Sequence, residues 1–337
     1  MALTIKDIAR LAGVSPTAVS FVLNEKAAGN VSPKNQQVIK NLIRQYAYKQ
    51  DRTAKALIMG RSFRIAICYQ NAPDAYPWLG NASHHLLINN IASRLHQTDY
   101  SIDLIEASPQ SSLNAHGTRL LAHHADGFFF INYAVAALEK IAFLLIHHGL
   151  PVVSVGTPVP TGDIDWVAAD RQISFEYLVN HALEQGITRL GFLDTDISKT
   201  YSAMKQGVFE RIMHARQLDA SAIQIINAFG VKAAARAVQQ MITSFPDLQG
   251  IVLTDNGLAP HIQLILSDRQ IQLFGFGDDI FVAQCEPQIP YMQLPMRQMA
   301  KLAVEHLLRK IERPDESAGL KTLVPCNFIG ALNIRNR

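Results

Sequence analysis

The side chains best suited to binding a charged partner gather in the first 61 residues of this 337-residue chain. This stretch holds ten Lys and Arg residues against three acidic ones, a net charge of +7, whereas the remaining residues carry −4. The basic residues are Lys6, Arg10, Lys26, Lys34, Lys40, Arg44, Lys49, Arg52, Lys55 and Arg61. Cations clustered on one small unit are typical of proteins that bind nucleic-acid phosphates. An ordinary solvated face is the alternative interpretation.

Sequence patterns for catalysis or metal binding are missing. The sequence has no Gly-x-Ser-x-Gly elbow, no phosphate loop ending in Gly-Lys-Ser/Thr and no His-Glu-x-x-His motif. Three His-His pairs, at 84–85, 123–124 and 147–148, are expected to be surface residues or partners of helix C-termini. The three cysteines are far apart and indicate no disulfide framework, and no apolar run could span a membrane. We therefore expect a cytoplasmic protein that is not an enzyme and needs no cofactor.

The first 47 residues predict three short helices. Thr4 caps the first helix with Asp7 as its capping-box partner, and Gly13 supplies the turn that follows. Ser-Pro pairs at 15–16 and 32–33 begin the second and third helices, with Ser as cap and Pro at the first helical position. Apolar residues recur at helical spacing in the three helices: Ile5, Ile8, Ala9, Ala12; Ala18, Val19, Val22, Leu23; Val38, Ile39, Leu42, Ile43, Tyr46. Two short helices around a tight turn indicate a helix-turn-helix, whose second helix usually enters the DNA major groove.

From residue 63 onward, short apolar runs alternate with helical stretches. Strands are predicted at 64–69, 101–107, 127–131, 151–155, 189–194, 223–228, 250–254, 271–276 and 332–334. Strands that alternate with helices of about ten to fifteen residues indicate βαβ units and parallel sheets covered on both faces. So many strands fit two doubly wound lobes better than one sheet, with a ligand at the carboxyl ends of the strands between the lobes.

The fold class expected is an all-α helix-turn-helix head-piece joined to an α/β two-lobed core of two doubly wound parallel sheets. We place the head-piece at 1–47, a basic hinge linker with a short helix at 48–61, and an effector-binding and dimerisation core at 62–337.

Gly and Pro residues predict that the chain crosses between lobes at 156–162 and again at 287–290. The first lobe would then span about 62–158 plus 291–318, and the second about 159–290 plus 319–337.

The sequence resembles the lactose repressor/galactose repressor (LacI/GalR) family of bacterial transcription regulators along essentially its whole length. The motifs that carry the resemblance are Thr-Ile-Lys-Asp-Ile-Ala-Arg-Leu-Ala-Gly-Val-Ser at 4–15, Val-Ser at 19–20, Val-Leu-Asn at 22–24 and Val-Ser at 31–32. Phe21 and the longer loop at 25–30 look most like the fructose and sucrose repressor branch. The family implies a core that resembles periplasmic sugar-binding proteins, which agrees with the two lobes expected above.

The resemblance also implies which head-piece residues touch DNA. Pro16, Thr17 and Phe21 occupy positions that face base edges. Phe21 replaces an Arg found in many members, so an apolar contact with a thymine methyl is expected in place of a bidentate guanine contact. The positions that hold phosphates, which set register rather than sequence, are Ser15, Ser20, Asn24, Ser32 and Tyr48.

In the linker, Ala54 and Leu57 match the minor-groove positions of the family. Leu57 matches a leucine that wedges into the central minor groove from a hinge helix that folds on the operator, which unstacks a base step and kinks the duplex. Gln50 stands where a proline usually begins this helix, and Asp51 could cap it instead.

The resemblance places effector-binding positions in the inter-lobe cleft at Gln70, Tyr76, Trp78, Met204, Lys205, Phe229, Asp255 and Asp278. Met204 replaces an Arg that grips a sugar or purine in many members. The aromatic side chains either stack on the ligand or pack in the core. Three options follow: an effector less polar than a pyranose, a phosphate bound by Lys205 or Lys199, or no effector.

The sequence predicts a homodimeric, sequence-specific DNA-binding transcriptional regulator, in the first place a repressor of a carbohydrate-utilisation operon. Its partners would be a near-palindromic double-stranded operator and a sugar or sugar phosphate, and no membrane. No leucine heptad follows the last predicted strand, so we expect a dimer and not a tail-joined tetramer. Two alternatives stay open: a regulator with a protein co-regulator or no effector, and a small-molecule binding protein with a vestigial head-piece.

Overall fold

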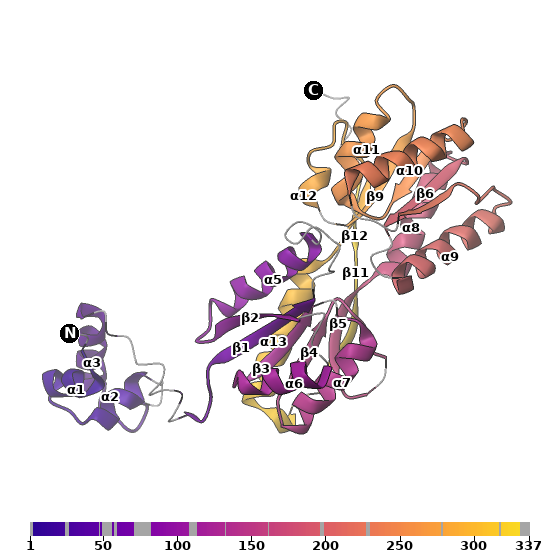
Figure 1. Cartoon of the computed structure of the whole chain (residues 1–337). Coiled ribbons are helices and arrows are strands. Elements are labelled where there is room, and N and C mark those ends of the chain that lie inside the picture. The colour runs from indigo at the N-terminus through magenta and orange to yellow at the C-terminus, as the bar shows by residue number, and fades with distance from the viewer. Residues whose placement is uncertain are drawn as a thin grey trace. The chain divides into compact units, whose positions relative to one another are not determined.

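The computed structural model describes residues 3–23, 27–46, 48, 56, 59–70, 82–107, 113–131, 133–160, 162–195, 199–226, 230–277, 279–316 and 318–330. By its internal contacts the chain divides into two compact units, Met1–Phe63 and Arg64–Arg337. Figure 1 colours both units along the chain, from indigo at the N-terminus to yellow at the C-terminus. None of the helices in the described ranges is long and apolar enough to cross a membrane.

The first unit is a three-helix head-piece made of α1 (Ile5–Ala12), α2 (Pro16–Leu23) and α3 (Pro33–Gln45). The predicted caps at Thr4 and Ser32 are confirmed, and Gly13 takes the left-handed conformation, with φ of 67°, that ends α1. A small core joins the three helices and the loop before α3: Ile8, Ala9, Val19, Val22, Ala27, Val31 and Ile39.

The predicted core face of α3 is partly wrong. Val38 and Tyr46 are 37% and 44% exposed, whereas Ile39 is fully buried. Among the described helices, α3 packs against α1 and α2, and a narrow stripe through Ile39, Leu42 and Ile43 is enough to cover them.

The first sheet of the core has six strands in the order β11-β5-β4-β3-β1-β2. Their bounds are β1 (Arg64–Gln70), β2 (Ser101–Ala107), β3 (Gly127–Ile131), β4 (Val152–Val155), β5 (Asp165–Asp170) and β11 (Lys321–Pro325). Every neighbouring pair is parallel. Parallel strands with helices on both faces are buried on both sides, and β3 is buried at every residue.

Helices cover the two faces of this sheet. Alternate residues of β1 and β3 face opposite sides: Ile65 and Phe129 join the cluster that includes α5 (Ala82–Leu95) and α13 (Met296–Glu312). Ala66 and Phe128 join the cluster under α6 (Leu113–Ala122) and α7 (Val135–His147). The sheet is therefore doubly wound, as predicted.

The second sheet repeats this arrangement in the order β12-β10-β9-β8-β6-β7. Its strands are β6 (Leu190–Thr195), β7 (Ile223–Ile226), β8 (Gly250–Leu253), β9 (Gln272–Gly277), β10 (Tyr291–Gln293) and β12 (Asn327–Ile329). All neighbours are parallel except β12, which runs antiparallel to β10. The helical elements beside this sheet are α8 (Arg171–Glu184), α9 (Lys199–Ala215), α10 (Val231–Ser244), η1 (Asn256–Leu258), α11 (Ala259–Ile265) and α12 (Asp279–Val282). One more short helix, η2 (Pro314–Glu316), follows α13.

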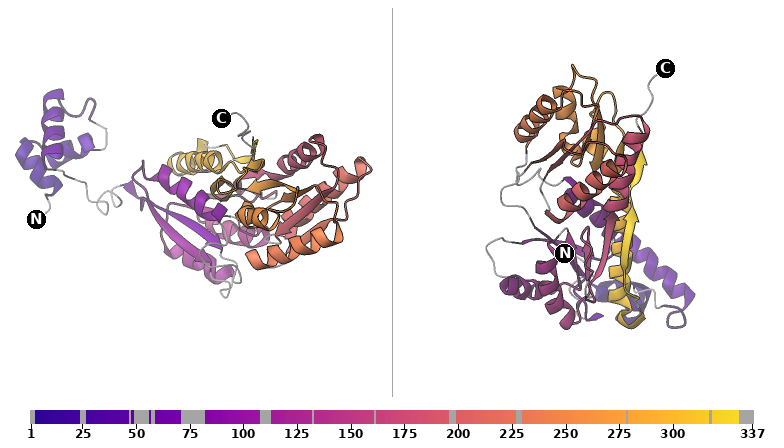
Figure 2. Two further views of the ribbon diagram at one scale, coloured as in Figure 1. Left: turned by 90° about the horizontal axis from the view of Figure 1, so that it is seen from above. Right: turned by 90° about the vertical axis from the view of Figure 1, so that its right-hand side faces the viewer.

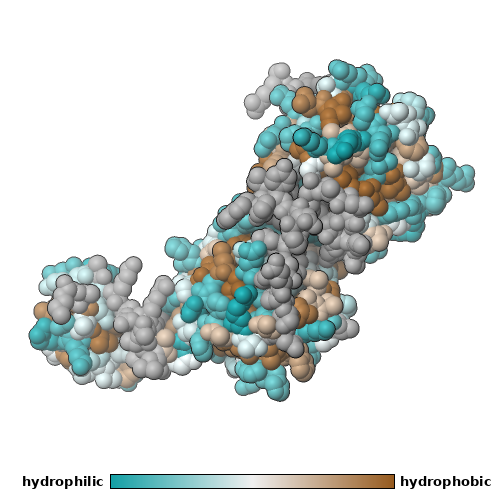
Figure 3. Space-filling view, in the orientation of Figure 1, coloured by the Kyte–Doolittle hydropathy of each residue, from teal (hydrophilic) through white to brown (hydrophobic). Residues whose placement is uncertain are grey.

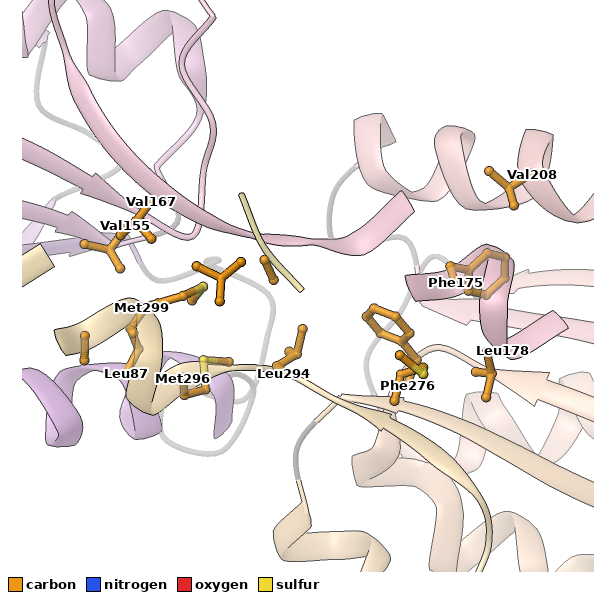
Figure 4. Close-up of a cluster of buried hydrophobic side chains, with 14 of the residues drawn as sticks. Leu87, Val155, Val167, Phe175, Leu178, Val208, Phe276, Leu294, Met296 and Met299 are labelled. Atoms are coloured by element: carbon orange, nitrogen blue, oxygen red, sulfur yellow. The ribbon is translucent and has the colours of Figure 1, made fainter. Parts of the chain in front are cut away.

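One cluster of buried apolar side chains spans both lobes. Figure 4 shows Leu87, Val155 and Met299 from the first lobe and Phe175, Leu178 and Phe276 from the second, all of one cluster of buried side chains. Leu294, which follows β10, lies between these two groups (Figure 4).

The sheets divide the chain differently from the expected lobe boundaries of 158/159, 290/291 and 318/319. β5 and β11 pair in the first sheet, and β10 pairs in the second. The chain therefore crosses after β5, after β10 and between β11 and β12; the last crossing is visible as the yellow strands of Figure 2, right. The sequence of β5, Asp-Trp-Val-Ala-Ala-Asp, has a single β-branched residue, and β10 and β12 have three residues each, so none has a recognisable apolar run. The strand predicted at 332–334 lies outside the described residues.

Candidate DNA-binding surface and effector site

Side-chain caps hold the head-piece helices in place. Thr4 Oγ1 accepts a hydrogen bond from the Asp7 backbone N–H at 3.3 Å, and Asp7 Oδ2 accepts one from the Thr4 N–H at 2.9 Å. The hydrogen bonds to Thr4 lower the pKa of the Asp7 carboxyl. Ser15 Oγ accepts from the Ala18 N–H at 3.2 Å, as expected of a cap of α2. The Ser15 cap therefore fixes Pro16 as the first residue of α2.

The start of α2 carries the candidate base contacts. Pro16 and Thr17 are exposed, and Phe21 is half-buried against the head-piece core. Thr17 and Phe21 are four residues apart and so share a helix face. This face offers a hydroxyl, a methyl group and part of an aromatic ring, with no acidic side chain in the first turn and no basic one in the last. Recognition of a base sequence by α2 would therefore depend on hydrogen bonds of the Thr17 hydroxyl and on apolar contacts of Thr17 and Phe21.

The candidate phosphate contacts lie around α2. Ser15 and Ser32 are exposed, while Ser20 and Tyr48 are half-buried. Ser32 Oγ accepts from the Asn35 N–H at 3.3 Å, so the two exposed serines are helix caps whether or not they touch DNA. The exposed cations of the described head-piece include Lys6, Arg10, Lys34, Lys40 and Arg44. Asn24, Ala54 and Leu57 lie outside the described residues.

In the core, polar side chains meet where the second sheet reverses direction. The chain leaves β6 through α9 to reach β7 on one side, and it returns through α10 to β8 on the other side of β6. Such a switch point opens a crevice at the carboxyl ends of the two central strands, and ligands of doubly wound sheets bind there. Asp194 lies at this end of β6, and Thr254 directly follows β8.

A buried ion pair occupies this switch point. Asp194 is fully buried, and its Oδ1 lies 2.5 Å from Nζ of Lys205, a residue of α9. The hydroxyl of Thr254 donates to the same oxygen. Burial lowers the pKa of Lys205, an effect that Asp194 beside it opposes. The positive charge of Lys205 is therefore already matched inside the protein.

Asp255 lies beside this pair. Its Oδ1 accepts from the Gly257 N–H at 2.9 Å and caps the short helix η1. Burial raises the pKa of Asp255, which the Gly257 N–H and the charge of Lys205 only partly offset. The switch point thus brings together the carboxyl groups of Asp194 and Asp255 and the ammonium group of Lys205, on which the positive charge of Arg171 also acts.

Two family descriptions match this chain. Residues 4–51 match the bacterial regulatory proteins of the lacI family, and residues 179–329 match the periplasmic binding protein-like domain. Among curated proteins, the HTH-type transcriptional regulator GalR of Lacticaseibacillus casei is 26% identical over 335 residues, covering 92% of this chain and 93% of that protein. The chain belongs to the LacI/GalR family.

Other LacI/GalR relatives agree with this assignment. The fructose operon regulatory protein of Vibrio cholerae is 32% identical over 181 residues, which is 52% of this chain and 48% of that protein. The solved lac repressor dimer, bound to operator and the anti-inducer ONPF, has a TM-score of 0.77 at 17% identity over 98% of each chain. A CelR-cellobiose complex has a TM-score of 0.67 at 15% identity, covering 98% of this chain and 99% of the other. At these identities the two structures show the shared fold.

The structure describes four of the LacI/GalR effector positions expected in this chain. Met204 is half-buried and packs against the main core, and Lys205 and Asp255 belong to the switch-point cluster. Gln70 is the last residue of β1, at the carboxyl edge of the first sheet. The other expected positions, Tyr76, Trp78, Phe229 and Asp278, lie outside the described residues.

Sequence reasoning did not select Asp194 or Thr254. Both belong to strands that the sequence predicts, at 189–194 and 250–254. The available signal was position: a polar side chain at the carboxyl end of a buried parallel strand points to a ligand site. Their partnership with Lys205 depends on residues 11 and 60 positions apart in the chain.

The histidine pairs are mostly surface residues, but His84 is buried and His123 is half-buried. His85, His124, His147 and His148 are exposed, whereas His84 is only 8% exposed. Burial, with His85 and Arg171 nearby, lowers the pKa of His84 to about 4. Among the described residues, no three His, Cys, Asp or Glu side chains gather where they could hold a metal ion.

Proposed function

We propose that this protein is a sequence-specific DNA-binding transcriptional regulator that represses a carbohydrate-utilisation operon. The observation that carries the proposal is the head-piece, which matches the lacI family. Its helix-turn-helix has a side-chain cap and a buried apolar core, and Pro16 and Thr17 are exposed at the start of α2. A vestigial head-piece is not expected to retain these caps together with exposed cations. The protein acts in the cytoplasm, where its DNA lies, and it is not an enzyme.

Two head-pieces of a homodimer bind the halves of a near-palindromic operator. Pro16, Thr17 and Phe21 face base edges; Ser15, Ser20, Asn24, Ser32 and Tyr48 hold phosphates; and Ala54 and Leu57 enter the minor groove from the linker at 48–61. Association as a dimer is compatible with a core surface on which hydrophobic residues interrupt hydrophilic ones (Figure 3). Phe143 and Leu264, for example, are each 74% exposed.

A small ligand, a sugar or a sugar phosphate, binds at the carboxyl ends of the strands and switches DNA affinity. The ligand must bind one arrangement of the two lobes more tightly than the other, because equal affinity shifts nothing. Support comes from relatives whose names include a fructose operon regulatory protein and a ribose operon repressor, and from a solved CelR-cellobiose complex.

Selection of DNA from a random pool by the purified full chain, at two salt concentrations, tests the proposal. We expect a near-palindrome with a flexible pyrimidine–purine step at its centre. Weak binding without sequence preference that falls steeply with salt would mean that the head-piece contacts phosphates alone. Thr17→Ala is the informative variant, because it should weaken binding to the selected site more than binding to random DNA. Thr243→Ala, an exposed threonine of α10 in the core, is its matched control.

A further inference from the structure

The histidines of this chain are distributed unevenly. None of the twelve lies in residues 1–61, which include the head-piece and the expected linker. Nine lie in segments of the first lobe, and three, His181, His214 and His261, lie in the second. Histidine is the side chain whose ordinary titration changes its charge between pH 5 and 8. A histidine-dependent change of DNA binding with pH would therefore come from the core and not from the head-piece.

Five of the first-lobe histidines lie at one edge of its sheet. Parallel strands are joined by helices that run back along the sheet, so helix C-termini and the amino ends of strands share an edge. At this edge, α6 and α7 pack against each other (Figure 1). The five residues, which we call the histidine edge, follow α5, follow α6, and end and cap α7: His96, His123, His124, His147 and His148. All are exposed except the half-buried His123.

The chain that comes from the head-piece enters the core at the same edge. Arg64 is the first residue of β1, and its Nη2 lies 2.5 Å from Asp103 Oδ2. His123 Nδ1 lies 4.0 Å from the same oxygen. The Asp126 N–H donates to the Arg64 carbonyl at 2.8 Å. The histidine edge therefore begins where the first sheet is joined to the DNA-binding unit.

The other charged side chains at this edge are of both signs. Arg64 pairs with Asp103, and Lys310 pairs with the buried Asp165. The cations include Arg64, Arg94, Arg309, Lys310, Arg313 and Lys321, and the acidic residues include Asp99, Asp103, Asp126, Asp163, Asp165, Glu312 and Asp315. Opposite charges nearly balance while the imidazoles are neutral. Protonation of the five histidines then makes the edge positive.

We propose that the histidine edge attracts the phosphates of the operator when its imidazoles are protonated, so that operator binding takes up protons. The inference rests on the proposed function, since the operator is the DNA that the head-piece binds. DNA carries one negative charge for about every 1.7 Å of its axis, which favours the protonated form of a histidine close to it. Because coupling between two binding events is reciprocal, a lower pH must then tighten DNA binding.

The operator affinity of the full chain, measured by fluorescence anisotropy at several pH values, tests this inference. If the complex takes up about half a proton, each pH unit changes the affinity about threefold, so binding at pH 6 should be about tenfold tighter than at pH 8. The affinity should also fall more steeply with salt at pH 6, because each further phosphate that is neutralised adds about −0.9 to the salt slope. An equal salt slope at both pH values would place the proton effect inside the protein and would overturn the inference.

Two matched double variants locate the effect. His147→Gln with His148→Gln removes two exposed histidines of the edge, and His214→Gln with His261→Gln removes two exposed histidines of the second lobe. We expect both to bind the operator at pH 8 as the wild type does. The edge variant should lose part of the pH dependence, and adding His123→Gln and His124→Gln should remove most of it. Unchanged pH dependence in the edge variants, or an equal loss in the second-lobe variant, contradicts the proposal.

Failure of this inference can be told apart from failure of the proposed function. If the chain selects an operator and binds it equally at pH 6 and pH 8, the regulator stands and the role of the histidine edge is wrong. If no operator is selected, but binding of random DNA tightens at low pH and the edge variants abolish this, the histidine edge stands and the regulatory function is wrong.

Discussion

Replacing Lys205 by methionine tests the buried ion pair at the switch point. The change removes the ammonium group that lies 2.5 Å from Asp194 Oδ1 and keeps a side chain of similar length. The Asp194 side chain is completely buried, and that of Lys205 is only 12% exposed, so solvent screens their interaction little. Breaking a buried pair by removing one partner costs roughly 3–5 kcal/mol, because the other charge stays buried without compensation.

The assay is urea unfolding of the full chain at pH 7, followed by circular dichroism. Lys232→Met is the matched control: Lys232 is exposed on α10 of the same lobe, and surface changes usually stay within about 0.5 kcal/mol. The double variant Asp194→Asn with Lys205→Met should regain most of the loss, because neither position of the pair then carries a charge and an acceptor for Thr254 is kept. A loss below about 1 kcal/mol for Lys205→Met, equal to that of Lys232→Met, would refute the reasoning, since a buried pair cannot be so cheap to break.

Three further predictions concern the head-piece and the first lobe. Thr4→Ala removes the capping box of α1 and should lower head-piece stability by about 1 kcal/mol, measured by thermal unfolding; the exposed Thr17→Ala should leave stability unchanged, and equal effects would contradict the role of the cap. Replacing thymine by uracil at one contacted position of the selected operator should weaken binding about fourfold, because one buried methyl is worth about 0.8 kcal/mol; fluorescence anisotropy measures this, and uracil that binds as well as thymine at every position rules the apolar contact out. Asp165 lies 2.9 Å from His306 Nε2 and 2.5 Å from Lys310 Nζ. Burial raises the pKa of Asp165, but hydrogen bonds from His306, Lys310 and the Leu320 N–H lower it overall. A carboxyl whose pKa is lowered in the folded state stabilises the protein above its unfolded pKa of about 3.9 and loses this contribution as the pH falls through the folded value. Asp165→Asn should therefore destabilise the chain at pH 7 and match the wild type when unfolding is repeated below about pH 3; a constant difference across this range would show that the carboxylate charge is not what matters.

The head-piece could be read from the sequence because its determinants are local. The Thr4–Asp7 capping box and the Ser15 and Ser32 caps join residues three apart, so their geometry follows from the helix itself. The pattern was less informative for α3, where only contact with α1 and α2 decided that Ile39 would be buried and Val38 exposed.

The core shows where local information ends. Eight of its strands were predicted because buried parallel strands are apolar runs bounded by turns. Only the tertiary structure decided which sheet each strand joins: β5 and β11 are more than 150 residues apart and pair residue by residue, from Lys321 with Trp166 to Pro325 with Asp170. The site depends on the same long-range order. Asp194, Lys205 and Thr254 carry no motif in common, and they meet because β6, α9 and the end of β8 converge at the switch point of one sheet. The sequence by itself determined the helices, most strands and the family; the buried carboxylate and its neighbours became a site only through the folding of distant segments onto one strand end.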